Sequence, residues 1–395
     1  MEVKDIHEMI NTWAAERCGD ARFDEEQQQA FIVNEDLSNI VDVGSAIIKA
    51  GWKDNFQQDM IDRIGIYVFS ARRVRSYRHD IMRRDTEYGS ILAKTRVKRF
   101  AATTNPTWGL QPGDIPEQFA FNPPTVRTTF FSDKLSWEID CSFPTVQLDS
   151  ALKNRYELQA WFDMIETTIS QGIDDEIADL IDRGVNGFIG EHINAARGVI
   201  DLLARYVTAT GDDTLTEDTM FTSEAFNKFC AYQYLLCKDR LRRKSSIYNM
   251  STEAGYDTAT PPELLHFYLH TDAAKALDVY LQSEVYHNEF TQIGNYESIP
   301  AWQSSGSEYE FALSSRIDIK IPSSPAADPI TVNRTGILGL MFDHDAIMLV
   351  NQNRRVTSAV NARGEFYNNF YKLDSHIITD LWENGIVFVA GTGTP

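Results

Sequence analysis

The chain has 395 residues, of which 43% are hydrophobic and 24% are charged, and its formal net charge is −20. A chain of this size buries a full core in two or three lobes, and its acidity argues against sequence-specific nucleic-acid binding. The four scattered cysteines and the lack of a secretory signal favour a reducing cytoplasm. No window approaches about 18 successive apolar residues, which argues against membrane insertion.

The first 36 residues are polar and acidic with a weak helical pattern, and we expect them to form an N-terminal arm. Residues 37–64 place apolar side chains three and four positions apart, which predicts helices punctuated by Gly51 and Gly65.

Residues 66–100 have a strand-like pattern with a strongly basic centre, which predicts two strands running out and back. Residues 72–99 contain ten basic and three acidic residues, which gives a local net charge of +7. A long hairpin without an apolar face is unstable alone, so it needs a surface to lie on, and an acidic sister molecule offers one. The alternative is a solvated hairpin without a partner. We expect the neighbouring subunit to be contacted by Arg72, Arg73, Arg75, Arg78, Arg83, Arg84, Lys94, Arg96, Lys98 and Arg99.

The middle of the chain begins with a loop at residues 105–124, which contain five prolines. Alternation over residues 125–148 predicts an antiparallel strand pair turned at 132–134. A single apolar stripe then predicts a long helix over about 152–184, capped by Asp149 or Ser150 and ended by Gly184 and Gly187.

The second half mixes both periodicities, which predicts an α+β lobe with a mixed or antiparallel sheet. Asn361 and Gly364 bound a predicted hairpin turn, and residues 321–329 are expected to form a surface loop. Helices are expected at 191–208, 223–242 and 272–289, and strands at 264–269, 336–342, 347–350, 356–360, 366–371, 377–378 and 386–389.

Known spacings for phosphate binding, nucleophilic catalysis or metal binding do not occur in the sequence. His266 and His270 share a face and form a conceivable metal pair, but packing explains them better. Residues 343–345 (Asp-His-Asp) resemble a ligand cluster, whereas a polar turn is the simpler interpretation. We therefore predict no catalytic, cofactor or metal site.

Two further features have structural explanations. Cys230 and Cys237 lie on one helix face, too far apart for a disulfide, and are expected to be core thiols. A basic cluster complements the dipole at a predicted helix end, with a phosphate or DNA contact as the alternative. Its members are Lys238, Arg240, Arg242, Arg243 and Lys244.

Two stretches resemble the major capsid proteins of tailed bacteriophages, closest to the short-tailed phage branch. They are VGSAIIKAGWKDNFQQDMIDRIGIYV at residues 43–68 and GLMFDHDAIMLVNQNRRVTSAVNARGEFYNNFYKLDSHIITDLWENGIVFVAG at residues 339–391. The second resembles the family's closing strands through its apolar-D-x-D-apolar turn, its N-x-x-G-x-[FY] hairpin and its final Val-Ala-Gly.

The resemblance implies the Johnson fold, an α+β capsid subunit with four parts and a returning C-terminal strand. The expected parts are an N-terminal arm (1–36), a peripheral domain with a spine helix (37–70 and 100–196), an extended loop (71–99), an axial domain (197–380) and a return strand (381–395).

The implied function is a non-enzymatic shell protein that self-assembles into hexamers and pentamers and encloses the phage genome in an icosahedral or prolate head. The implied partners are other copies, a separate scaffolding protein, a portal protein and non-specifically held double-stranded DNA, with assembly in the host bacterial cytoplasm. The alternative is an encapsulin-like nanocompartment shell of the same fold. Covalent cross-links between subunits are not expected.

Overall fold

The computed structural model describes most of the chain, and its contacts divide it into two units. The first unit comprises Met1–Gly89, Lys134–Leu180 and Val350–His376, and the second comprises Ser90–Asp133, Ile181–Leu349 and Ile377–Pro395. The described residues are 3–18, 30–71, 81, 92–102, 104, 109–115, 119, 121–131, 134–217, 219–251, 255–282, 296–300, 302, 317–322, 329–334 and 336–391.

The first unit contains a three-stranded sheet with the strand order β10-β11-β3. Its strands are β10 (Ile347–Asn361), β11 (Phe366–Thr379) and β3 (Leu135–Pro144), and β11 runs antiparallel to β3 with Tyr371 opposite Ile139. The Asn361 side chain accepts a hydrogen bond from the Gly364 amide, which confirms the predicted hairpin turn. The four short strands predicted between 347 and 378 therefore form two long ones.

Helix α6 (Arg155–Asn194) is much longer than the predicted 152–184. Its apolar stripe is buried as expected, for example at Ile165 and Ile177. The prediction that Gly184 and Gly187 end the helix is wrong. A Cβ on Gly184 would lie 3.1 Å from Ile377 Cγ2, so this glycine permits close packing within a continuous helix.

The start of α6 also differs from the prediction. Asp149 and Ser150 do not cap it, because they belong to the short helix α5 (Thr145–Ala151). The Asn154 side chain instead accepts a hydrogen bond from the Tyr156 amide at the first turn.

Three further helices of the first unit are α1 (Val3–Cys18), α3 (Ile40–Lys49) and α4 (Lys53–Ala71). The weak helical pattern of the N-terminal arm is confirmed, because Ile6, Ile10 and Trp13 are buried. Gly51 separates α3 from α4 with a φ of +73°, a backbone conformation that glycine adopts without strain. Helix α4 continues through residues 66–71, where a strand was predicted.

Two strands of the second unit have a different partner from the one expected. Strand β1 (Leu92–Val97) pairs antiparallel with β2 (Val126–Phe131), with Arg96 opposite Arg127. Strands at 126–131 and 135–144 were predicted, but their pairing with each other is wrong, because β3 joins β11 in the first unit. The predicted outgoing strand of the basic hairpin falls partly in α4 and partly on residues outside the described ones.

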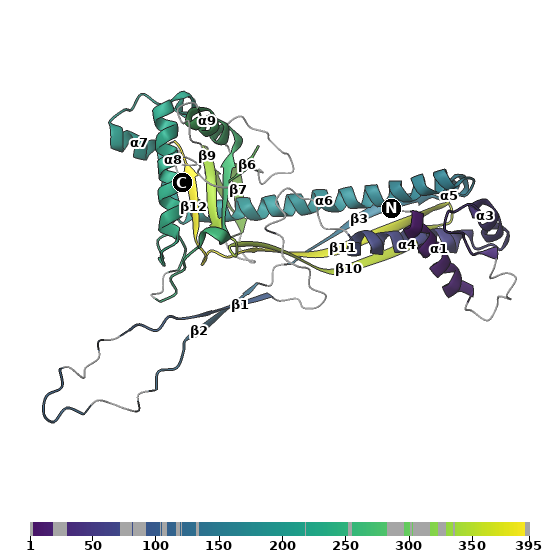
Figure 1. The fold of residues 1–395 in the computed structure, drawn as a ribbon, viewed down its shortest axis with the longest axis horizontal. Coiled ribbons are helices and arrows are strands. Elements are labelled where there is room, and N and C mark those ends of the chain that lie inside the picture. Colours follow the sequence, from purple (N-terminus) through teal and green to yellow (C-terminus); the bar gives the residue numbers. More distant parts are fainter. Residues whose placement is uncertain are drawn as a thin grey trace. The chain divides into compact units, whose positions relative to one another are not determined.

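A five-stranded mixed sheet with the order β4-β12-β9-β5-β6 forms the centre of the second unit (Figure 1). It contains parallel pairs (β4 with β12, β5 with β6) and antiparallel pairs (β12 with β9, β9 with β5), as the predicted mixed sheet requires. Its strands are β4 (Val199–Asp201), β5 (Leu265–His270), β6 (Glu297–Ile299), β9 (Ile337–Asp343) and β12 (Gly385–Val389).

Helices α7 (Leu202–Thr210), α8 (Glu224–Leu241) and α9 (Thr271–Gln282) pack on this sheet. The helix predicted at 191–208 is wrong in part, because it spans the end of α6, strand β4 and most of α7. Tyr234 on α8 is fully buried against Phe267 and Phe388 of the sheet. The other short elements are η3 (Met220–Thr222), η4 (Pro262–Leu264), β7 (Ile317–Pro322) and β8 (Pro329–Arg334).

The contact division groups residues 350–376, expected in the axial domain, with the first unit, and residues 100–133 and 181–196, expected in the peripheral domain, with the second. For residues 350–376 the reason is that β10 and β11 form a sheet with β3 there rather than joining the five-stranded sheet.

Candidate assembly interface

Strands β1 and β2 and the described residues between them form what we call the β1–β2 extension (within residues 92–131; Figure 1). The two strands are joined by a regular antiparallel register and by a 3.1 Å hydrogen bond between the Thr95 and Thr128 hydroxyls. A two-stranded ribbon is marginally stable alone, so contacts with the rest of the second unit must fix its base.

Those contacts form an anchor cluster, which we define as Lys94, Arg96, Arg127, Asp380, Trp382 and Glu383. The Lys94 ammonium lies 2.9 Å from Asp380 Oδ2 and 2.8 Å from Glu383 Oε1. The Arg96 guanidinium donates to the same two carboxylates, at 2.9 Å from Glu383 Oε1. The Asp380 side chain is only 2% exposed, so removing one of these two cations would leave a buried carboxylate with less compensation.

The charges of the anchor cluster stabilise each other. Burial disfavours the charged form of Arg96, but hydrogen bonds and charge from Glu383 and Asp380 outweigh it and raise the pKa of Arg96. The Arg127 guanidinium also lies 4.1 Å from the centre of the Trp382 ring, within range of a cation–π interaction. Both strands of the extension are therefore held by the turn that contains Asp380, Trp382 and Glu383.

The next residues of the extension contact a second loop of the same unit. The Arg99 amide donates to the Gly255 carbonyl at 2.9 Å, and its guanidinium lies 3.3 Å from Asp257 Oδ2. Gly255 has a φ of +96°, and a Cβ there would approach the Lys98 side chain to 3.0 Å.

The structure thus places four of the ten predicted contact residues, Lys94, Arg96, Lys98 and Arg99, against their own subunit. For Lys94, Arg96 and Arg99 the acidic partners are intramolecular, because Asp257, Asp380 and Glu383 lie within reach in the fold. The other six predicted contacts, Arg72, Arg73, Arg75, Arg78, Arg83 and Arg84, lie outside the described residues, and their role stays a prediction.

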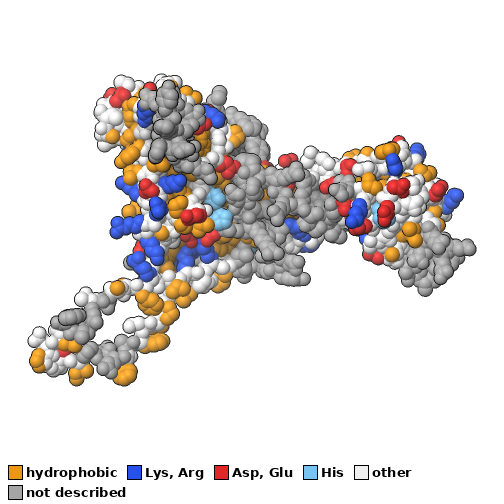
Figure 2. Space-filling view, viewed as in Figure 1, with side chains coloured by type: hydrophobic (Ala, Val, Ile, Leu, Met, Phe, Trp, Pro, Cys, Tyr) orange, Lys and Arg blue, Asp and Glu red, His pale blue; other side chains and the backbone are white. Residues whose placement is uncertain are grey.

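The loop between β1 and β2 exposes large apolar side chains. Phe119 and Phe121 are 91% and 87% exposed, and Ile115 is almost fully exposed. Figure 2 shows hydrophobic side chains along this loop, at the lower left of the view. The prolines predicted a loop here, and the apolar residues between them were a second readable signal in the sequence.

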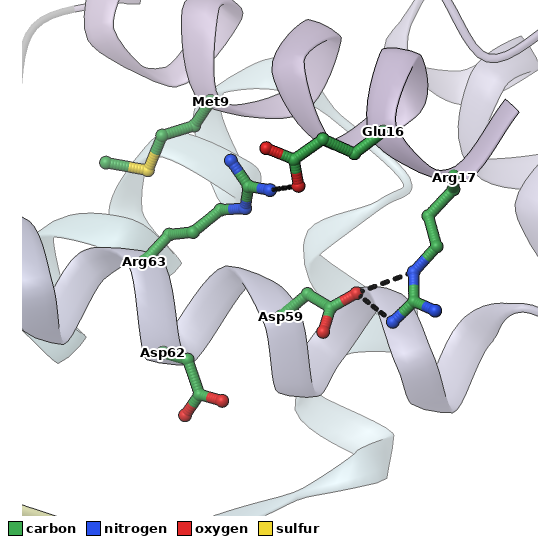
Figure 3. A pocket seen from close by; sticks show the side chains of 6 residues that line it. All are labelled: Met9, Glu16, Arg17, Asp59, Asp62 and Arg63. Atoms are coloured by element: carbon green, nitrogen blue, oxygen red, sulfur yellow. Dashed lines mark hydrogen bonds and ion pairs between the residues drawn. The ribbon is translucent and has the colours of Figure 1, made fainter. Parts of the chain in front are cut away.

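A cavity of about 680 Å³ lies between α1 and α4 of the first unit (Figure 3). Arg63 pairs with Glu16, and Asp59 accepts hydrogen bonds from Arg17 and from the Trp13 indole at 2.8 Å. These bonds tie the two helices together. The remaining carboxyl group, Asp62, has its pKa raised to about 6, chiefly by burial.

The polar clusters noted in the sequence have structural roles. Asp343 Oδ1 accepts from the Asp345 amide at 2.9 Å, which confirms the predicted turn between β9 and β10. His266 pairs with His344 at 2.8 Å, whereas His270 is buried 3.6 Å from Asp272. Within the described ranges, no group of three or more His, Cys, Asp or Glu side chains is arranged to hold a metal ion.

Cys230 and Cys237 are buried free thiols, as predicted. Burial raises the pKa of both, that of Cys237 to about 11, so both are protonated at neutral pH. Of the helices that the structure describes, none has the length and apolar character needed to span a bilayer.

Known proteins give the fold and the family. A model of the Phi29-like phage major capsid protein family matches residues 21–389. The chain is similar to one in the capsid structure of Staphylococcus phage Andhra, with 9% identity, 80% of this chain and 84% of that chain covered, and a TM-score of 0.52.

A second similar chain is in the structure of the head fiber and inner core protein gp22 of native bacteriophage P68. It shares 8% identity, with 80% of this chain and 85% of that chain covered and a TM-score of 0.50. Curated proteins give no match to the chain. At such low identity the solved structures support the α+β capsid fold, and the family match carries the assignment.

Proposed function

This chain belongs to the Phi29-like phage major capsid protein family, and we propose that it builds the head shell by laying its β1–β2 extension on a second copy of itself. The protein is a structural subunit of the phage head, and its copies assemble into the capsid of the virion. Neither the family match nor the similar structures favour the nanocompartment alternative.

The observation that carries the proposal is the exposure of Phe119 and Phe121 at the far part of the extension. Burying a phenylalanine side chain contributes about 1.5 to 3 kcal/mol, so two such side chains in water favour any contact that covers them. Clustered exposed apolar residues mark protein–protein interaction sites. In a protein whose copies assemble, another copy is the most abundant partner.

The anchor cluster supports the same proposal from the other end of the extension. Lys94 and Arg96 tie β1 to a nearly buried carboxylate, so the base of the extension has a fixed direction before assembly. A preorganised ribbon loses less conformational entropy on docking than a free loop does. The anchor therefore orients the extension, while its apolar far part makes the contact.

We extend the proposal to the basic residues at 72–84, which we expect to meet the acidic surface of the neighbouring copy. Exposed ion pairs contribute only about 0.2 to 1 kcal/mol each, so these residues set orientation while apolar burial supplies cohesion. The finer assembly steps are part of the proposal: hexamers and pentamers, a separate scaffolding protein, a portal, non-specifically held double-stranded DNA, a non-enzymatic role and assembly in the host cytoplasm.

The double variant Phe119→Ser/Phe121→Ser tests the proposal. We expect a subunit with unchanged circular dichroism that no longer forms particles in negative-stain images under the conditions in which the unmodified chain does. Val279→Ser, which removes an exposed apolar side chain from α9, is the control and should assemble normally. Normal shells from the double variant would overturn the docking role of the extension.

A further inference from the structure

The C-terminal end of α8 carries positive charge on an otherwise acidic protein. Residues 238–244 hold five basic residues and one acidic residue, a local net charge of +4 on a chain of −20. Lys238 and Arg240 lie in the last helical turn, where they complement the helix dipole. Arg242, Arg243 and Lys244 follow the helix and are exposed, so the dipole accounts for them less well.

These three cations form few ion pairs within the described part of their own subunit. Arg242 lies 3.8 Å from Asp239, but both side chains are more than half exposed and the pair is weak. Arg243 and Lys244 form no ion pair with any residue that the structure describes. Figure 2 shows blue side chains gathered on the side of the second unit where α8 lies.

The backbone that carries the cations is fixed. The Arg243 amide donates to the Arg240 carbonyl at 3.2 Å, and the Ser245 amide donates to the Thr258 carbonyl at 3.0 Å. The positive charges therefore project from an ordered turn, which reduces the entropy lost when a partner binds.

Exposed apolar side chains accompany these charges. Ile247 is 70% exposed, and Tyr232 and Leu235 are exposed on α8. A surface selected for DNA needs phosphate contacts, whereas protein interfaces combine apolar and aromatic groups with arginine. This composition favours a protein partner with a negatively charged surface. We call Tyr232, Leu235, Arg242, Arg243, Lys244 and Ile247 the α8 face.

We propose that the α8 face of one subunit binds the acidic loop at residues 212–217 of a second copy. This inference rests on the proposed function, because it requires copies to meet in a shell. Within the loop, Asp213 is exposed, and Asp212 is positioned by hydrogen bonds that the Thr214 amide and hydroxyl donate to its Oδ1. The Thr216 amide also donates to the Thr219 hydroxyl at 3.0 Å, so the loop is ordered too.

The cations of the α8 face (Arg242, Arg243 and Lys244) and the acidic loop lie near opposite ends of α8, which is 18 residues long. At 1.5 Å per residue this helix separates them by about 27 Å. A self-complementary pair at two different places on a subunit makes a head-to-tail contact, and repeated head-to-tail contacts close into rings when the rotation permits. The contact therefore suits a ring of copies within one capsomer.

Charge reversal and compensation test the proposal on the full chain. We expect Arg242→Glu/Arg243→Glu and Asp212→Lys/Asp213→Lys each to lower particle yield by about tenfold or more, because like charges then face each other at every repeat. Combining all four substitutions restores opposite charges and should recover most of the yield. Lys228→Glu/Lys275→Glu is the control and should assemble. It changes the net charge of the same unit as much as Arg242→Glu/Arg243→Glu does.

Particle yield is measured by sedimentation and negative-stain imaging, and subunit folding by circular dichroism. Normal yield from either double variant overturns the proposal, as does failure of the fourfold variant when its subunit is folded. Normal shells with reduced DNA content in Arg242→Glu/Arg243→Glu also overturn it and assign the face to DNA. Failure of the unmodified chain or of the control to form particles would instead contradict the proposed function.

Discussion

Asp62 illustrates how one buried carboxyl group makes stability depend on pH. Burial raises its pKa from 3.8 to about 6, so between these values the folded subunit binds more protons than the unfolded chain. Stability from this group is thus fully present below about pH 4 and is lost as pH rises through 6. Asp62→Asn keeps the acceptor for the Ser358 hydroxyl and removes the charge.

We expect Asp62→Asn to stabilise the unassembled subunit at pH 7 by about 1 kcal/mol, a value reduced for the partial exposure of the group. Melting temperatures of both proteins across pH 4 to 7.5 measure this, and the difference should shrink toward zero at the acidic end. A constant difference at all pH values would show that the substitution acts through packing rather than through charge.

Arg96 and Arg99 lie three residues apart, and we expect them to contribute very different amounts to the free energy of unfolding. Arg96→Ala leaves the nearly buried Asp380 with Lys94 as its remaining cation from the anchor cluster, and we expect a loss of about 2 kcal/mol in unfolding free energy. The Arg99 side chain is 57% exposed, so Arg99→Ala should cost less than about 1 kcal/mol. Urea unfolding compares the two. Equal losses would contradict the assigned role of the anchor cluster.

Among the elements, α6 offers a direct test of what a helical glycine does. A Cβ on Gly187 meets no atom within 4 Å, whereas one on Gly184 meets Ile377 and Ile347. Gly187→Ala should therefore stabilise the subunit by about 0.5 to 1 kcal/mol, because alanine restricts the unfolded chain and favours the helix. Gly184→Ala should gain less or destabilise. Thermal unfolding of both variants measures the difference. An equal gain would show that the side chains around Gly184 shift to accommodate a Cβ.

The same helix shows what periodicity predicts at this scale. The apolar stripe identified α6 correctly, because apolar residues recur at every third or fourth position and these residues face the core. Its end was misplaced, because glycine both terminates helices and permits close packing, and only the position of Ile377 distinguishes the two cases. Strand partners were also missed: β3 was located, but its partner β11 lies more than 200 residues away and leaves no mark on local alternation.

At the scale of the molecule, charge patterning singled out a basic segment, and its contact with another copy stays a prediction. Lys94, Arg96 and Arg99 were expected to reach another copy, whereas acidic residues far along the chain bind them within one subunit. A count of charges does not distinguish the two, because it holds no information on which carboxylates the fold brings near. The apolar residues at 115–121 were overlooked because prolines dominated the interpretation of that loop.

The net charge of −20 sets how assembly should respond to salt. Long-range repulsion between acidic copies acts over tens of ångströms and is screened at a Debye length of about 8 Å at 0.15 M ionic strength, whereas direct ion pairs at contact are screened less. If apolar burial supplies the cohesion, screening the repulsion should favour assembly more than screening the ion pairs weakens it. We therefore expect the initial rate of particle formation, followed by light scattering, to rise as ionic strength increases from about 0.02 to 0.15 M.

In Phe119→Ser/Phe121→Ser the same increase should not restore assembly, because screening replaces no apolar contact. A steep fall in the rate for the unmodified chain would mean that ion pairs, rather than the apolar part of the β1–β2 extension, hold the copies together.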